Sequence, residues 1–203
     1  MLLGVFGESL FRPGPLRGLI RRLVPVQRFD ELGVPLTVTA VDLESGELVL
    51  FGAGGRIDVS LEDALYATCA LPLYFPPAAL DGHLYVDGGL RSVLPLDEAA
   101  RFEPDVLFAV DVGPSWRETP PDHPLRVPPL VRRSGQVQRV MMAAQTENAV
   151  ARWRARPAGS RPELVLVEPA VRAETTFRLD LVGLYADEGY RAASAVLSAR
   201  RVP

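Results

Sequence analysis

The chain has 203 residues, of which 48% are hydrophobic and 23% are charged, and its formal net charge is −3. These values are ordinary for a globular protein with a core of its own, so we expect a single domain over residues 1–203 and no nucleic-acid partner. No apolar run approaches the ~20 residues that cross a bilayer, and the apolar start of the chain lacks the basic segment and cleavage site of a signal peptide.

Cysteine and arginine usage limit what can be inferred about disulfides, metal clusters and binding patches. Cys69 is the single cysteine, so no internal disulfide and no cysteine metal cluster forms; we expect a reducing, cytoplasmic compartment and a small buried side chain. All 22 residues counted as Lys+Arg are arginine, which indicates a GC-rich genome rather than selection for bidentate chemistry. Doubled arginines such as Arg21 and Arg22 are therefore interpreted as solvated faces.

The first predicted elements are a short helix and a hairpin. Residues 16–23 place leucine and isoleucine on one helical face. Residues 34–41 favour a strand, and a Glu-Ser-Gly turn separates them from the apolar residues 48–51. This pattern predicts two antiparallel strands joined by the turn.

A capped helix and a second hairpin follow. Ser60 and Asp63 form a capping box, in which the hydroxyl and the carboxylate satisfy free N–H groups at the start of a helix. Pro72 ends that segment. The Asp-Gly pair at 81–82 separates two short extended runs and is a hairpin signal.

The second half of the chain alternates helices with continuously apolar strands, as α/β proteins do. Strands that are apolar at every position are expected to be buried on both faces. In chain order the predicted elements are a helix at 95–101, a strand at 106–110, a proline-rich loop at 114–129, a helix at 136–154, a strand at 164–167 and a helix at 184–200.

The most informative feature is a strand that ends on an acid and turns sharply on two glycines, Asp87-Gly88-Gly89. Such a turn holds a carboxylate at the rim of a sheet, and the glycines allow positive φ and a close backbone approach. Taken alone, an Asp-Gly pair is common at surface hairpin turns. The flanking segments decide between these two interpretations.

Three segments in this order carry a resemblance: Ala67-Thr68-Cys69-Ala70-Leu71-Pro72, then Phe75-Pro76-Pro77, then Tyr85-Val86-Asp87-Gly88-Gly89 with Pro95 six residues on. Together they resemble the second half of the domain of patatin-like phospholipases, here the bacterial acyl hydrolases of this family. Further similar stretches extend the likeness over nearly the whole chain, at 35–43, 105–112 and 188–190.

The resemblance implies an α/β fold of three layers, α/β/α, with a mainly parallel sheet between helices, here without the N-terminal strands and nucleophile elbow. It implies a phospholipase or lipid esterase of lipid metabolism that uses a Ser–Asp dyad without a metal or cofactor. Asp87 would be the dyad acid, supported by Gly88 and Gly89, and would accept the serine proton without a histidine. A carboxylate is a poor base in water, so the site must be partly desolvated. The expected partner is an acyl lipid or other ester, with peripheral membrane contact; the oligomeric state is open.

The serine of this dyad has no counterpart in the chain. No serine stands in a Gly-x-Ser-x-Gly elbow, and the glycine-rich oxyanion loop is also absent; each donor of such a loop contributes ~3 kcal/mol to catalysis. Smaller departures from the family pattern are Thr68 for serine, Leu73 for glycine, and Ser92 and Val93 where asparagines are frequent. We therefore expect the chain as given to be inactive alone.

Three interpretations of this half site stay open. We favour a normal enzyme whose start is assigned too late, so that the exposed edge of a parallel sheet makes the 203-residue chain poorly stable. The second is a non-catalytic truncated protein that binds lipid or a partner. The third is a metal-dependent enzyme with an aspartate cluster, drawn from Asp81, Asp87, Asp105 and Asp111.

Overall fold

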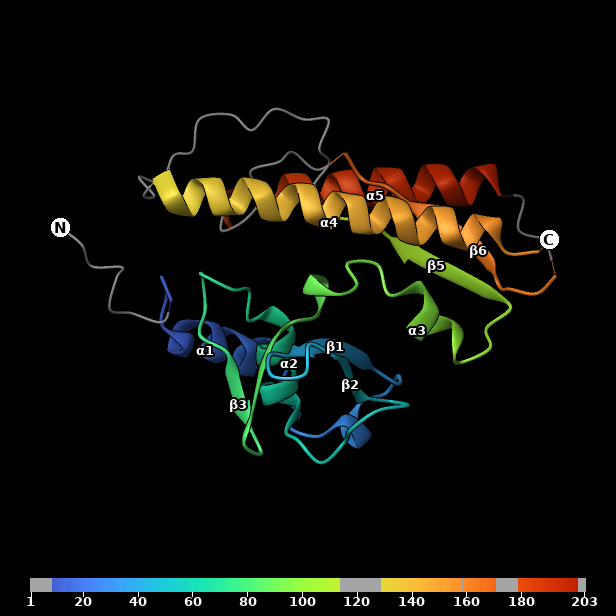
Figure 1. Cartoon of the computed structure of the whole chain (residues 1–203). Coiled ribbons are helices and arrows are strands. Elements are labelled where there is room, and N and C mark those ends of the chain that lie inside the picture. Colours follow the sequence, from blue (N-terminus) through green and yellow to red (C-terminus); the bar gives the residue numbers. More distant parts are fainter. Residues whose placement is uncertain (1–8, 114–128, 158, 171–178, 201–203) are drawn as a thin grey trace. The chain divides into compact units, whose positions relative to one another are not determined.

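A computed structural model describes residues 9–113, 129–157, 159–170 and 179–200 (Figure 1). The chain divides into two compact units, Met1–Ser92 and Val93–Pro203, called here the N-terminal unit and the C-terminal unit. Both units contain helices and strands, which confirms a mixed α/β protein. None of the described helices combines the length and apolar character that a membrane span requires.

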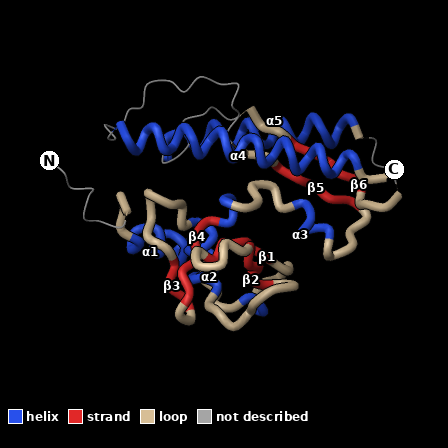
Figure 2. Tube along the Cα trace, in the orientation of Figure 1, coloured by secondary structure: helices blue, strands red, loops and turns tan. Residues whose placement is uncertain are grey.

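The N-terminal unit contains a four-stranded sheet in the order β2-β1-β4-β3, and every neighbouring pair is antiparallel. Figure 2 shows these strands with the helices of the unit. In chain order the elements are α1 (Pro13–Leu23), a 3-10 turn η1 (Phe29–Glu31), β1 (Thr37–Asp42), β2 (Leu48–Gly52), α2 (Leu61–Cys69), β3 (Ala78–Leu80), β4 (His83–Asp87) and a 3-10 turn η2 (Gly88–Leu90).

Both predicted hairpins are confirmed. β1 and β2 pair across a turn in which Gly46 has φ of 71°. β3 and β4 pair across Asp81 and Gly82, whose φ angles of 50° and 82° are both positive, as a two-residue type I′ turn requires. Short turns of this kind fix the strand register locally, which is why the sequence alone predicted them.

The core of the N-terminal unit lies between α2 and the sheet. α2 contacts β1, β3 and β4, and Phe51, Leu61 and Ala64 are fully buried there. The predicted capping box is confirmed in its first half: the Ser60 hydroxyl accepts a hydrogen bond from the Asp63 amide at 3.0 Å. In its second half the Asp63 carboxylate accepts from the Ser60 hydroxyl at 2.7 Å instead of reaching the backbone.

The C-terminal unit contains two parallel strands in register, from Val106↔Glu163 to Val110↔Val167. Val150 and Trp153 of the long helix α4 pack on these strands, and α5 contacts β6. In chain order the elements are α3 (Leu96–Ala100), β5 (Val106–Val110), α4 (Pro129–Ala155), β6 (Glu163–Val167), a 3-10 turn η3 (Leu179–Leu181) and α5 (Val182–Ala199).

Two expectations about the sheets are wrong for the described strands. The sheet is not mainly parallel, because three of the strand pairings are antiparallel and β5–β6 alone is parallel; the tight turns of the N-terminal unit connect only antiparallel neighbours. β5 is not buried on both faces, because Phe108 and Val110 are 56% and 53% exposed. The three-layer arrangement and the single domain stay predictions, and the proline-rich loop lies outside the described residues except for Pro129.

Candidate functional site

Asp87 lies at the rim of the antiparallel sheet, where β4 ends and the η2 turn begins. Its backbone amide donates to the carbonyl oxygen of Ala70, just beyond α2, at 3.2 Å. Its Oδ1 accepts from the Gly89 amide at 2.7 Å. Backbone pairing with Ala40 of β1 holds the same residue from the other side. Three separate segments therefore fix the position of this carboxyl group.

The two glycines after Asp87 have different roles from those expected. Neither adopts a positive φ, so that expectation is wrong. Gly88 is buried, and a Cβ there would lie 2.1 Å from Thr39 Oγ1 and 2.6 Å from the Thr39 carbonyl oxygen. The expected close backbone approach is thus present at Gly88, where only glycine lets the turn pack against β1.

The environment of Asp87 favours its use as a base. Burial raises the pKa of this carboxyl group above its usual value, although the hydrogen bond from Gly89 acts in the opposite direction. Oδ2 accepts no hydrogen bond from any residue that the structure describes. A partly desolvated carboxylate with one tethered and one open oxygen can take a proton at the open oxygen.

Cys69 is exposed, contrary to the expectation of a small buried residue. It ends α2 and immediately precedes Ala70, which holds the Asp87 amide. Partial desolvation of the sulfur and the negative charge of Asp87 both raise the pKa of this thiol. The thiol is therefore protonated near neutral pH and is a poor nucleophile.

The loop after α2 contains a strained residue. Leu73 has φ of 70°, the left-handed region that costs an L-residue about 1 kcal/mol or more. The resemblance leads one to expect glycine at this position, and glycine adopts such a φ without strain. The carbonyl groups of Leu73 and Tyr74 accept hydrogen bonds from the amides of Leu10 and Phe11, each at 2.8 Å.

The four aspartates of the alternative metal site do not gather in the structure. Asp87 ends β4, whereas Asp81 lies in the hairpin turn that precedes this strand, so the length of the strand, roughly 14 Å, separates them. Asp81 instead pairs with Arg56 at 2.5 Å. Asp105 and Asp111 belong to the C-terminal unit and flank β5. Among the described residues no group of three or more His, Cys, Asp or Glu side chains is placed to hold a metal ion.

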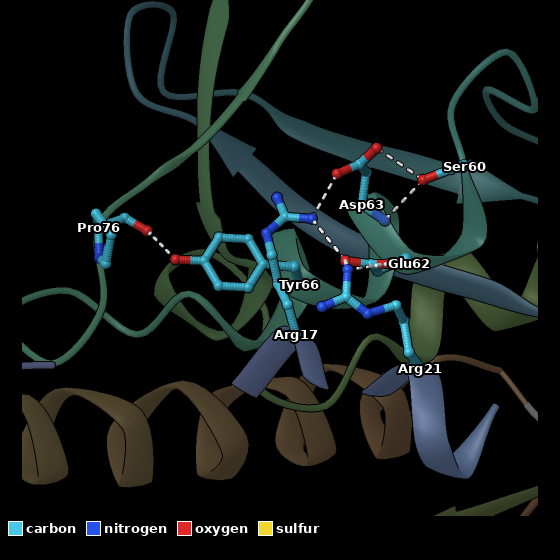
Figure 3. A network of polar contacts seen from close by, with 7 residues as sticks. All are labelled: Arg17, Arg21, Ser60, Glu62, Asp63, Tyr66 and Pro76. Atoms are coloured by element: carbon cyan, nitrogen blue, oxygen red, sulfur yellow. Dashed lines mark hydrogen bonds and ion pairs between the residues drawn. The ribbon is translucent and has the colours of Figure 1, made fainter. Parts of the chain in front are cut away.

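A polar network between α1 and α2 was not predicted from the sequence (Figure 3). Arg17 Nη1 contacts Asp63 Oδ1 at 2.7 Å and Glu62 Oε1 at 3.2 Å. Its guanidinium lies 4.2 Å from the centre of the Tyr66 ring, and the Tyr66 hydroxyl donates to the Pro76 carbonyl at 2.8 Å. The network thereby ties α1, α2 and the double-proline loop into one body.

The charges of this network stabilise one another. Burial alone would raise the pKa of Asp63, but hydrogen bonds from Ser60 and Arg17 outweigh it and hold that pKa below its usual value. Burial alone would lower the pKa of Arg17, and its contacts with Asp63 and Glu62 raise it instead. Both groups are therefore ionised throughout the neutral range.

Comparison with known proteins covers the part of the chain that contains this site. Residues 1–100 match the family model for patatin-like phospholipases. The patatin-like segment, as we call residues 1–100, includes Asp87, Gly88 and Gly89, so the resemblance drawn from the sequence is confirmed there. The likeness at 105–112 and 188–190 lies beyond the match and stays a prediction.

Longer relatives share part of the chain. Two uncharacterized NTE family proteins of Mycobacterium tuberculosis and one of Mycobacterium bovis are each 30% identical to it over 111 residues. The match covers 55% of this chain and 29% of each relative. The chain therefore spans less than a third of the length of these relatives.

Proposed function

We propose that this chain is part of a patatin-like serine acyl hydrolase that cleaves ester bonds of acyl lipids with a Ser–Asp dyad. Asp87 is the acid–base partner in this proposal, and a part of the protein outside these 203 residues supplies the serine and the oxyanion donors. The family match over residues 1–100 supports the class of reaction. The lack of a Gly-x-Ser-x-Gly elbow in the chain, and the greater length of the relatives, support an outside origin of the serine.

The observation that carries the proposal is the state of the Asp87 carboxyl group. Oδ1 is fixed by the Gly89 amide at 2.7 Å, so the group cannot rotate freely. Oδ2 accepts no hydrogen bond from the described residues, and burial raises the pKa of the group. This is what a base needs if it is to take a proton from a serine hydroxyl without a histidine between them.

The proposed reaction consists of acylation of the serine and hydrolysis of the acyl-serine, and Asp87 accepts and returns the proton in both steps. The serine Oγ attacks the acyl carbonyl carbon while its proton passes to Asp87 Oδ2, and the alcohol leaves with that proton as the ester C–O bond breaks. Water then attacks the acyl-serine carbon while Asp87 accepts the water proton. The serine leaves with this proton and the fatty acid is released, so the dyad returns to its starting state.

The parallel strands of the C-terminal unit support the idea that further chain completes the fold. The edge of β5 away from β6 pairs with no other described strand, and Phe108 and Val110 are exposed beside it. Parallel strands are normally covered on both faces, and bare edges are avoided. In this proposal a further parallel strand from the missing part pairs with β5.

A fluorophosphonate probe, which labels activated serines, tests the proposal. We expect no labelling of the 203-residue chain, and labelling at an elbow serine in a longer protein that contains this chain and its flanking residues. In the longer protein, Asp87→Asn should reduce ester hydrolysis by about a thousandfold, the range seen when a catalytic group is removed.

The matched control is Asp81→Asn, the same change in the turn that precedes β4, which should leave hydrolysis unchanged. Labelling of any serine in the 203-residue chain would overturn the proposal, and so would full activity of the Asp87→Asn variant. A longer protein that is folded yet unlabelled would also overturn it and would favour a binding role.

A further inference from the structure

Helix α1 belongs to a stretch with an unusual charge pattern. From Ser9 to Phe29 the chain contains five arginines and no aspartate or glutamate, whereas the whole chain has a net charge of −3. The stretch also contains exposed leucines. A basic and apolar surface within an acidic protein indicates a specific partner rather than general solubility.

One side of α1, called here the inner side, packs against the rest of the N-terminal unit. Leu16 and Ile20 pack against the core of the N-terminal unit. Arg17 and Arg21 point to the same side and pair with Glu62, with Arg17 also reaching Asp63 (Figure 3). These contacts fix the rotation of the helix about its own axis.

The side of α1 that faces away from the paired arginines, which we call the outer edge, consists of Leu19, Arg22 and Leu23, and it adjoins Leu16, which lies only about 20° around the helix from Leu23. Leu19 lies about 160° around the helix from both paired arginines, Arg17 and Arg21, and only about 40° from Leu23. Leu19 and Leu23 are 37% and 67% exposed. Arg22 forms no ion pair with any residue in the described part of the chain. The helix therefore presents two apolar side chains beside an uncompensated positive charge.

We propose that the outer edge of α1, together with Arg12 at the start of the helix, docks on a lipid bilayer that carries anionic headgroups. Leucine side chains enter the boundary between headgroups and acyl chains, and arginines contact the phosphates. An anionic bilayer is complementary to this surface, because the outer edge combines apolar and positive side chains and contains no acidic residue. This inference rests on the proposed function, for which an acyl lipid is the substrate.

The same contacts link the outer edge to the catalytic acid. α1 is fixed on α2 by Arg17, and the residue just after α2, Ala70, holds the Asp87 amide. The loop that follows is bonded to Leu10 and Phe11, directly before α1. Docking through α1 would therefore place Asp87 at a constant position relative to the lipid surface.

Vesicle co-sedimentation of the full 203-residue chain tests the proposal. We expect binding to vesicles of phosphatidylglycerol and phosphatidylcholine, weak binding to phosphatidylcholine alone, and release at about 0.5 M NaCl, where charges are screened. The double variant L19S/L23S and the variant Arg22→Glu should each lower the partition coefficient about tenfold.

Matched controls keep the test specific. Val34→Ser removes an exposed apolar side chain of the same unit outside α1, and Arg152→Glu reverses an exposed arginine of α4; both should bind within about twofold of the unchanged chain. Asp87→Asn should bind vesicles normally, so failure of the catalytic proposal and failure of this one are distinguishable. Amide hydrogen exchange of the unchanged chain supplies a second readout. Addition of anionic vesicles should slow exchange at the amides of α1 more than at other amides of the chain.

Three results would overturn the proposal. The first is equal binding to anionic and neutral vesicles or to neither. The second is unchanged binding of both outer-edge variants. The third is a concentration-dependent dimer that L19S/L23S abolishes, which would assign the outer edge to self-association instead.

Discussion

The two units of the chain differ in how deeply the large side chains of their strands are buried. In the N-terminal unit Phe51 and Leu61 are fully buried, whereas in the C-terminal unit Phe108 of β5 is mostly exposed. Three buried side chains with a hydroxyl or indole group lack a hydrogen-bond partner: Thr146, Trp153 and Tyr185. Among the described residues, such groups occur only in the C-terminal unit. These buried polar groups and the exposed face of β5 set the described part of the C-terminal unit apart from that of the N-terminal unit.

The difference follows from the type of sheet in each unit. Antiparallel strands joined by tight turns find their partners nearby in the sequence, so both hairpins of the N-terminal unit form from local segments. Parallel strands depend on crossovers and on neighbours from distant segments, and β5 has such a neighbour only on the β6 side among the described strands. Local pairing makes a unit independent of the rest of the protein, whereas non-local pairing does not.

The largest expected effect is on the packing of the Asp87 turn. Gly88→Ala should destabilise the N-terminal unit by about 3 kcal/mol, because its Cβ would overlap Thr39. Denaturant unfolding measures this change. The control Gly18→Ala, in an α1 position with open space around the new Cβ, should keep or raise stability. Equal unfolding midpoints for both variants would show that the turn is looser than the structure indicates.

The next effect concerns the network between α1 and α2. Arg17→Met should cost about 1–2 kcal/mol, since it removes a partly buried ion pair and the contact with the Tyr66 ring. Because the pKa of Asp63 is held low in the folded state, this contribution is present above the unfolded pKa of Asp and is lost as the pH falls through the folded value. Denaturant unfolding at pH 7 and at about pH 2.5 measures the loss.

The comparison variant for this network is Arg28→Met, which removes the exposed pair with Asp30 and should cost at most about 0.5 kcal/mol. An equal cost for the two substitutions at pH 7 would contradict the structural role assigned to Arg17.

A smaller effect of opposite sign is expected at Asp87. Its folded pKa is raised by burial, so its ionisation opposes folding, and this cost appears as the pH rises through the unfolded pKa toward the folded one. Asp87→Asn should therefore raise stability by roughly 0.5–1 kcal/mol at pH 7 and leave it unchanged near pH 3. Thermal melts at the two pH values measure the difference; stabilisation at low pH alone would refute the desolvation argument.

A further small gain is expected in the loop beside the acid. Leu73→Gly should stabilise the N-terminal unit by up to about 1 kcal/mol, because glycine adopts the left-handed backbone of this position without strain. Leu71→Gly, two residues earlier and without positive φ, should destabilise by a similar amount. A loss of stability in both variants would show that the Leu73 side chain matters more than its backbone.

The smallest change in stability should come from the exposed face of β5. Phe108→Ser should alter the unfolding free energy by less than about 0.5 kcal/mol while reducing aggregation. Phe51→Ser, the same substitution at a fully buried position of β2, should cost more than about 3 kcal/mol. If Phe108→Ser proves as costly as Phe51→Ser, the contrast between the two units is incorrect.

The features that the sequence predicted well are those that short segments determine. The Asp81-Gly82 turn and the Ser60 cap each depend on neighbouring residues, and both are present. The position of Asp87 at a strand end also follows from adjacent glycines. The patatin-like resemblance added the chemical role of this acid, which no local pattern indicates.

The features that it missed depend on contacts between distant segments. Arg17 and Glu62 are 45 residues apart, and the pattern of either helix taken alone does not indicate that they meet. The exposure of Phe108 depends on which strands lie beside β5, and the left-handed Leu73 appears in the sequence as an ordinary leucine. Paired acids at 62 and 63 were the one available signal for the network, since α1 offers arginines at helical spacing.

Cys69 offers a chemical probe of the charge on Asp87. It is the single cysteine of the chain, it is exposed, and the charge of Asp87 acts on its thiol. A thiol reagent therefore modifies one known atom, and Asp87→Asn should lower the pKa of this thiol and speed its reaction near neutral pH. The influence of the Asp87 charge can thus be followed in the 203-residue chain, without any turnover of substrate.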